Sequence, residues 1–412
     1  MFRPLVFLLA AVILDPAWAD DQKQPSKTDI AQIHDGVITI DTHVDIPRSF
    51  ATQEFDPADT DASGSQVDLT RMEAGGLDAA FFIVYTPQDR LTPARYAKAM
   101  ELAFLKFSAI HRMTDELYPD RVGLARTAAD VRRLHGEGKR IALIGVENGF
   151  PMGEDVGMLR TFHALGARYF GLVHNGHNQL ADSAQPNFAL GNEATLYGGL
   201  SDLGRAAVRT CNALGIMVDI SHAAKSSTLE TIALSKAPVI ASHSGVKGVR
   251  NHPRNLSDEE LLALKANGGV VQIVALDFFI KKPTDEKQAA ITGLRKDLGL
   301  ETSADFSTAT PETLATFRTR LAEIDAKYPG GDVSDLVDHI DYAAKLIGVD
   351  HVGIASDFQG GGGITGWNDA SETQAVTAEL LKRGFSAEDV AKIWGGNLLR
   401  VMEAVEAAAV GE

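Results

Sequence analysis

The stretch Val37-Ile38-Thr39-Ile40-Asp41-Thr42-His43-Val44-Asp45 decides between the two architectures that the chain's pattern allows. Its first four residues form the kind of apolar run found in strands that are buried on both faces. An open, doubly wound sheet normally follows its first strand with a glycine-rich phosphate-binding turn, and residues 38–45 contain no glycine. The stretch therefore favours a closed barrel over an open sheet with an added domain.

Seven further apolar runs of similar length follow along the chain. They are Ala79–Val84, Ile141–Val146, Tyr169–Val173, Ile216–Ile220, Pro238–Ala241, Gly269–Val274 and His351–Ala355. Between them lie segments with apolar residues at helical spacing: Arg95–His111, Thr127–Gly138, Leu200–Leu214 and Ser257–Asn267. Two of these segments begin with a helix-capping signal, at Thr127 and at Ser257. Strand followed by helix, repeated eight times, predicts a (β/α)8 TIM-type barrel.

The interval Lys281–Asp350 separates the seventh and eighth runs and is the longest of the chain. It contains two helical patterns, Pro311–Lys327 and Val333–Gly348. We therefore expect one domain, residues 37–412, that carries a helical insertion, residues 281–350, before the last strand.

The N-terminus has the pattern of a secretory signal peptide. Arg3 precedes an apolar run that ends at Leu14, and Ala17-Trp18-Ala19 resembles a cleavage site, so we predict a signal peptide over residues 1–19. The run is too short to span a bilayer, which argues against a membrane anchor. Residues 20–36 are expected to be a lead-in, flexible from Asp21 to Thr28, and the mature protein is expected to be secreted or periplasmic.

Composition excludes several classes of partner. The chain has 39 Lys and Arg against 55 Asp and Glu, a net charge of −16, which argues against binding to nucleic acid or an anionic membrane. With a single cysteine, Cys211, the chain has neither an internal disulfide nor a thiolate metal cluster. Any transition metal must be held by nitrogen and oxygen.

Side chains that can coordinate a metal follow six of the eight apolar runs. They are His43, Asp45, Glu147, His174, His222, His243 and Asp357. All strand ends of a barrel open onto one face, so we expect these side chains to meet in one cavity. Buried charges persist only when they are paired or bound to a metal, and a metal site explains the convergence.

Each of these residues has an ordinary explanation when it is taken alone. A His-Xaa-Asp pair such as His43 and Asp45 occurs by chance, and Glu147 could stabilise a helix N-terminus. The ordinary explanation would have to hold separately at six strand ends. Three imidazoles and two carboxylates suit zinc, with manganese or cobalt as alternatives. Five ligands exceed the needs of one open tetrahedral ion, but they suffice for two ions if Glu147 bridges them.

The chain resembles the membrane dipeptidase (renal dipeptidase) family of binuclear zinc peptidases, a branch of the amidohydrolase-like barrels. The likeness runs from about Asp41 to Val401 and rests on short motifs in the family's order. They are Asp41–Pro47, Gly145–Gly149, Leu214–His222, Pro238–Ser244, Arg254-Asn255, Val352–Phe358, Leu380–Phe385 and Gly396-Asn397.

The resemblance implies that the protein hydrolyses dipeptides with two Zn2+ ions per chain. His43 and Asp45 would hold one ion, His222 and His243 the other, and Glu147 would bridge both around a nucleophilic hydroxide. Asp357 would transfer the proton, and His174 would polarise the scissile carbonyl, with His177 as a rival for that role. Arg254 would grip the substrate carboxylate, with Arg250 as a rival, and Asn255 beside it would also bind the substrate. A homodimer is compatible with the resemblance, and nothing in the composition decides it.

Two departures from the family pattern concern the substrate. Gln359 stands where relatives commonly have a second aspartate after Asp357-Phe358. A tyrosine that helps to bind the substrate carboxylate in relatives has no match in Leu276–Phe279. The substrate class is therefore left open at this point between dipeptides and another small amide, such as a lactam or an N-acyl amino acid. A non-catalytic periplasmic binding protein is the alternative outside the enzymes.

Overall fold

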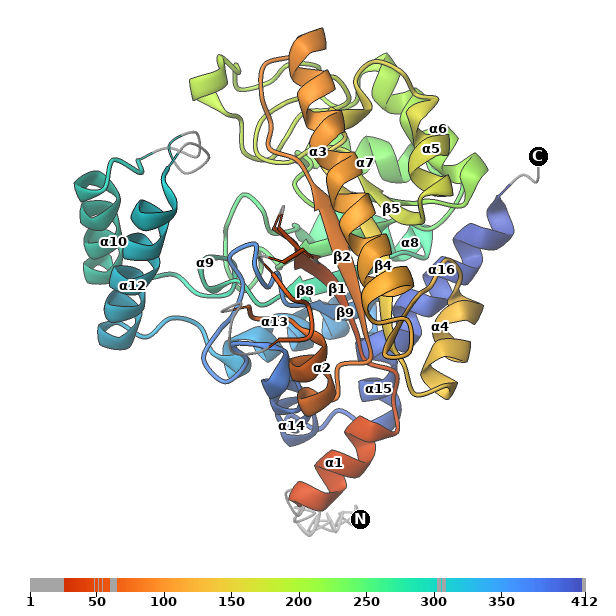
Figure 1. Ribbon diagram of the computed structural model, residues 1–412, viewed down its shortest axis with the longest axis vertical. Helices are drawn as coiled ribbons and strands as arrows, with labels where there is room; N and C mark the ends of the chain where they lie inside the picture. Colours follow the sequence, from red (N-terminus) through yellow and green to blue (C-terminus); the bar gives the residue numbers. More distant parts are fainter. Residues whose placement is uncertain are drawn as a thin grey trace, which may run out of the picture.

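The computed structural model describes residues 26–409, except 48, 51, 54, 60–64, 302–304 and 306–308. Within these ranges the chain forms a nearly closed ring of parallel strands with helices around it (Figure 1), so the predicted barrel is confirmed. The predicted signal peptide lies outside the described residues. No helix in the described ranges is long and apolar enough to cross a membrane.

The eight strands of the ring follow one another in chain order. They are β1 (Ile40–Asp45), β2 (Ala79–Tyr85), β4 (Arg140–Glu147), β5 (Ala167–Gly171), β6 (Met217–Asp219), β7 (Ile240–Ser244), β8 (Val270–Val274) and β9 (Val352–Ala355). The ring closes beyond β9, where Asp357 N–H donates to the His43 carbonyl and Asp45 N–H to the Phe358 carbonyl. A short strand that the sequence analysis did not predict, β3 (Val122–Leu124), pairs with β4 outside this ring.

Several strands extend further toward their carboxyl ends than the apolar runs indicate. The first predicted run ended at Ile40, whereas β1 begins there and continues to Asp45, because its polar residues still pair with β2 as far as Ile83. Similarly, Glu147 is the last residue of β4, and β7 contains His243. Several candidate metal ligands are therefore held by strands rather than by loops.

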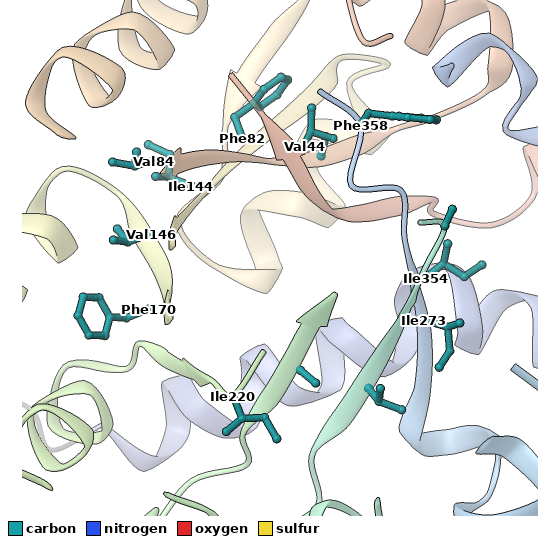
Figure 2. Packing of buried hydrophobic residues seen from close by; sticks show 14 of the residues in the cluster. Val44, Phe82, Val84, Ile144, Val146, Phe170, Ile220, Ile273, Ile354 and Phe358 are labelled. Carbon is teal, nitrogen blue, oxygen red and sulfur yellow. The ribbon is translucent and has the colours of Figure 1, made fainter. Parts of the chain in front are cut away.

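The strands are buried on both faces. Along β2, Phe81 and Ile83 belong to one apolar cluster, whereas Phe82 and Val84 belong to another. Figure 2 shows residues of the larger cluster, which come from strands all around the ring. Successive side chains of a strand point to opposite faces, so burial on both sides explains the continuous apolar runs in the sequence.

The helices cover the outside of the ring. They are α1 (Lys27–Asp35), α2 (Leu69–Gly75), α3 (Pro93–His111), α4 (Ala128–Gly136), α5 (Met158–Ala164), α6 (Asp202–Leu214), α7 (Lys225–Leu234), α8 (Asp258–Asn267), α9 (Asp277–Ile280), α10 (Asp285–Asp297), α12 (Pro311–Lys327), α13 (Val333–Ile347), α14 (Gln374–Lys382), α15 (Ala387–Ala391) and α16 (Asn397–Ala408). The predicted caps are present: the Thr127 side chain accepts from Asp130 N–H, and Ser257 forms a capping box with Glu260.

Part of the predicted lead-in is ordered. Ser26 and Asp29 form a capping box that begins α1 at Lys27, and α1 packs against α14. The prediction of a flexible segment as far as Thr28 is therefore wrong at its C-terminal end, because a local capping signal starts a helix there.

The long interval before β9 contains two kinds of helix. Helices α10 and α12 pack against each other and project to one side of the barrel (Figure 1). Helix α13 instead packs against α8, α14, β8 and β9, as the barrel helix between the last two strands. Below, the α10–α12 lobe means residues 285–327.

Candidate metal centre and active site

A cavity of about 1000 Å³ opens at the carboxyl ends of the strands. Seven of the predicted site residues line it: Asp45, Glu147, His174, His222, His243, Arg254 and Asp357. His43 is also close to this group, although it is only 1% exposed. Strand ends from distant parts of the sequence thus deliver their side chains to one place, as the barrel topology predicts.

Glu147 lies at the centre of this group. One of its carboxylate oxygens, Oε2, is 3.6 Å from His43 Nε2. The other, Oε1, is 3.0 Å from His222 Nε2 and 3.5 Å from His243 Nε2. The two oxygens therefore face different histidines.

The inward nitrogens of two histidines face each other. His222 Nε2 and His243 Nε2 lie 2.9 Å apart. A neutral imidazole has one N–H donor and one acceptor nitrogen. Two Nε2 atoms this close therefore either share one N–H proton in a hydrogen bond or both coordinate a cation. On the other side of the site, Asp45 Oδ2 lies 3.8 Å and Asp357 Oδ1 4.0 Å from His43 Nε2.

In His43, His222 and His243, the Nδ1 atom contacts a neighbouring side chain, and this contact orients the ring so that Nε2 points into the site. The pairs are His43 Nδ1 with Tyr169 Oη (2.9 Å), His222 Nδ1 with Asn175 Oδ1 (3.1 Å) and His243 Nδ1 with Ser242 Oγ (2.8 Å). Ser242 Oγ in turn donates to Asp219 Oδ2 at 2.7 Å. Partners of this kind orient metal-binding histidines and raise their basicity.

The carboxylates and imidazoles of this group shift one another's pKa values. Burial disfavours the Glu147 carboxylate, yet the charged His43 holds its pKa well below the usual value. Burial also acts against the charged form of His43, but Glu147 and Asp45 raise its pKa to about 9. Burial and Glu147 raise the pKa of Asp45 to about 6, and its Oδ1 has no hydrogen-bond partner among the described residues.

The donor set fits divalent metal. Three compact groups of side chains could hold a metal: His43 with Glu147 and His243; Glu147 with His174 and His222; and His43 with Asp45 and Asp357. Imidazole nitrogen and carboxylate oxygen are the ligands that zinc takes when thiolates are absent. The unpartnered Oδ1 of Asp45 and the facing nitrogens of His222 and His243 are the features that a cation would satisfy.

Asp357 is held at the rim of this group by the backbone that follows β9. Its φ of 59° lies in the left-handed region, and His222 has a φ of 68°. Residues other than glycine rarely adopt this conformation, and such strain is concentrated at functional sites. Burial, together with Asp45 and Glu147, raises the pKa of Asp357 to about 8 against the effect of His43. Gly360 is required beside it, since a Cβ there would lie 2.3 Å from both Asp357 Oδ1 and Asp45 Oδ2.

The structure separates His174 from its rival. His174 lines the cavity with Nε2 3.9 Å from Glu147 Oε1, and burial lowers its pKa to about 4, so the ring is neutral near pH 7. His177 is buried within its own loop, where Nδ1 accepts from Ser183 N–H and Nε2 contacts the Glu193 carbonyl. Of the two, only His174 is available to a ligand in the cavity.

Arg254 is likewise separated from Arg250. The Arg254 guanidinium lines the cavity at 2% exposure, with its carbon 5.4 Å from the centre of the Phe279 ring. Its Nη2 donates to the His243 carbonyl, and its Nε has no partner among the described residues. Arg250 does not line the cavity and donates to the neighbouring Asn251 carbonyl.

Asn255 does not face the cavity. Its Oδ1 accepts from Gly245 N–H, and its Nδ2 donates to the carbonyls of Arg250 and Phe279. A direct contact with substrate, as predicted from the sequence, is not supported, because the amide is used up by backbone groups. Its position suits a residue that fixes the loop bearing Arg254.

The two departures from the family pattern both appear at the cavity wall. Gln359 lines the cavity, and its Nε2 donates to Ser65 Oγ at 2.6 Å, so the amide is tied to a neighbouring loop. In the segment without a tyrosine, Leu276 and Phe279 line the cavity. Phe279 gives Arg254 an aromatic face but no hydroxyl.

Three residues near the cluster were not predicted from the sequence: Tyr85, Lys106 and Tyr169. Tyr85 ends β2 one position beyond the apolar run Ala79–Val84, and Tyr169 begins the run Tyr169–Val173, so an aromatic residue looks ordinary at both positions. Lys106 carried a readable signal. It occupies the buried face of α3 together with Ala99, Ala103 and Ile110, at helical spacing where an apolar residue is expected.

A (β/α)8 barrel whose strand ends gather imidazoles and carboxylates in this way defines a metal-dependent hydrolase. The sequence profile of the membrane dipeptidase family (peptidase family M19) matches residues 27–412. The chain belongs to this family and is a metallo-dipeptidase.

Named relatives agree with this assignment. The chain is 32% identical to dipeptidase verJ of Clonostachys rogersoniana, over 89% of this chain and 84% of verJ. It is also 32% identical to dipeptidase aclJ of Aspergillus oryzae, over 84% of this chain and 72% of aclJ. Among solved structures, the probable dipeptidase PvdM of Pseudomonas aeruginosa has a TM-score of 0.82 and 32% identity, covering 93% of this chain and 98% of PvdM.

Proposed function

We propose that this dipeptidase works with two zinc ions, one held by His43 and Asp45 and the other by His222 and His243, with Glu147 shared between them. The single observation that carries the proposal is the orientation of Glu147, whose Oε2 faces His43 while Oε1 faces the other two histidines. When bound, the ions lower the pKa of a coordinated water and polarise the scissile carbonyl.

Asp357 moves the proton in this proposal. It accepts a proton from the attacking water and returns it to the leaving amine, a role that is most efficient when the pKa lies near the working pH. The raised pKa of about 8 and the position beside Asp45 support this role.

His174 and Arg254 bind the substrate on the other side of Glu147. Because the His174 ring is neutral near pH 7, its Nε2 can donate a hydrogen bond to the oxygen on which negative charge develops. The Arg254 guanidinium pairs with the free carboxylate of the dipeptide, for which its planar fork is suited. Asn255 supports Arg254 by holding its loop.

We further propose that the protein acts outside the cytoplasm, in the periplasm or after secretion. Support comes from the charged, apolar and small-residue pattern of residues 1–19. Expression of the full chain, followed by N-terminal sequencing of the mature protein, tests this. Cleavage after Ala19 is the expected result, and an intact Met1 in the exported fraction would contradict it.

The test of the metal proposal is a measurement of zinc content and turnover on one preparation. The expected result is two zinc ions per chain and hydrolysis of Ala-Ala that is lost on chelation and restored by zinc. One zinc per chain at full activity would overturn the shared role of Glu147.

A further inference from the structure

Lys106 is a buried charge in the cavity to which the proposed mechanism gives no role. It lies on α3, lines the cavity and is only 5% exposed. Its Nζ stands 5.5 Å from the centre of the Tyr85 ring. Among the residues that the structure describes, Nζ has neither a hydrogen bond nor an ion pair. The Tyr85 ring gives the ammonium group a cation–π contact but neither a negative charge nor a hydrogen-bond acceptor. A buried ammonium group that lacks both is costly, so its position calls for a ligand.

The position of Lys106 in the barrel shows which part of a substrate it faces. The order of the ring is β1-β2-β4-β5-β6-β7-β8-β9, so β2 and β7 lie on opposite sides. Lys106 belongs to the helix that follows β2, whereas Arg254 belongs to the loop that follows β7. With the carboxyl end of a dipeptide on Arg254 and its peptide bond over Glu147, the amine-side residue extends toward Lys106.

The charges around Lys106 do not satisfy it. Burial lowers its pKa, and the negative charges of Asp45 and Glu147 partly offset that effect. Both carboxylates are committed to metal in the proposed function. The ammonium group is then left without a counter-ion, beside an aromatic ring that can pack against aliphatic carbons.

We propose that Lys106 binds an acidic side chain on the amine-side residue of the substrate, so that the enzyme prefers dipeptides that begin with glutamate or aspartate. The proposal rests on the proposed function, because it assumes that Arg254 holds the other end of the dipeptide. Tyr85 forms the wall of this subsite, and Lys106 supplies its charge.

The test compares Glu-Ala with Gln-Ala, which have nearly the same shape and differ in charge. For the zinc-loaded protein, kcat/KM should be about 10- to 100-fold higher for Glu-Ala, as expected for one charge-assisted hydrogen bond. In Lys106→Met the preference should fall to about twofold or less, mainly through a rise in KM for Glu-Ala. Lys106→Arg should keep most of the preference. Lys98→Met, at an exposed position of the same helix, is the matched control and should leave the ratio unchanged.

Binding provides a second measurement that depends neither on turnover nor on a variant. Phosphinate mimics of Glu-Ala and Gln-Ala, titrated by calorimetry into the zinc-loaded protein, should differ in Kd by a similar factor. Equal Kd values would overturn the proposal, and so would an equal loss of both activities in Lys106→Met, which would assign Lys106 to the charge balance of the metal site. Turnover of Ala-Ala without any preference for Glu-Ala defeats this inference alone. Absence of dipeptide turnover in protein that holds two zinc ions defeats the proposed function as well.

Discussion

The metal cluster and the α10–α12 lobe satisfy their buried charges in opposite ways. In the lobe, Lys287 is 1% exposed and is paired with Asp277 at 2.6 Å and Asp325 at 3.0 Å. In the cavity, Lys106 has no such partner among the described residues, and the carboxylates converge on imidazoles in groups that could hold a metal. Burial acts on both lysines, but the pKa of Lys287 is raised by its carboxylates whereas that of Lys106 is lowered. Charges that the chain itself satisfies are structural, and charges that it leaves unsatisfied mark binding sites.

The largest effect on the metal cluster is expected when the charge of Glu147 is removed. Glu147→Gln keeps the shape of the side chain but removes its charge and replaces one carboxylate oxygen with an NH2 group, which cannot coordinate zinc. We expect zinc content to fall below two ions per chain and kcat/KM for Ala-Ala to fall by about 1000-fold or more, equivalent to about 4 kcal/mol. Metal analysis and steady-state kinetics on one preparation check both outcomes. Retention of two ions at full activity would show that the cluster does not depend on this carboxylate.

The second prediction separates proton transfer from metal binding. Asp357→Asn removes a group whose pKa is raised to about 8 and leaves a side chain of the same size. Loss of a general acid-base group costs about 100- to 10,000-fold in rate, so kcat should fall within that range while the zinc content stays at two. A variant that loses zinc in proportion to activity would instead make Asp357 a ligand, as its grouping with His43 and Asp45 permits.

The sequence could predict the cavity far better than the substrate. Strands that are buried on both faces produce continuous apolar runs, and the residues at their ends must share one face of a barrel, so His43, Glu147 and His243 could be placed together without coordinates. Asn255 could not be placed, because a motif says nothing of where an amide finds its hydrogen bonds. Lys106 was missed because helical spacing shows which face of α3 is buried but not what that face meets.

The third prediction concerns pH and the metal-free protein. Glu147 and Asp45 raise the pKa of His43 to about 9, so below that pH the ring carries a proton that zinc must displace. The affinity for zinc should therefore rise about tenfold per pH unit between pH 6.5 and 8.5, and zinc should be lost on acidification. Competition with a chelator of known affinity at several pH values measures this slope. A flat profile would mean that His43 is already neutral in the metal-free site and is not a charged member of the cluster.

The smallest effect on activity is expected in the lobe. Lys287→Met removes the cation that pairs with Asp277 and Asp325. Because these two carboxylates are 21% and 47% exposed, solvent can stabilise them, so the free energy of unfolding should fall by only about 1–2 kcal/mol and the effect should stay local. Hydrogen exchange in α10 should quicken, while the zinc content stays at two and kcat/KM for Ala-Ala stays within about threefold of wild type. A large fall in kcat/KM would show that the lobe controls the cavity. The link would be Asp277 at the start of α9, which lies two residues before Phe279, the residue whose ring contacts Arg254.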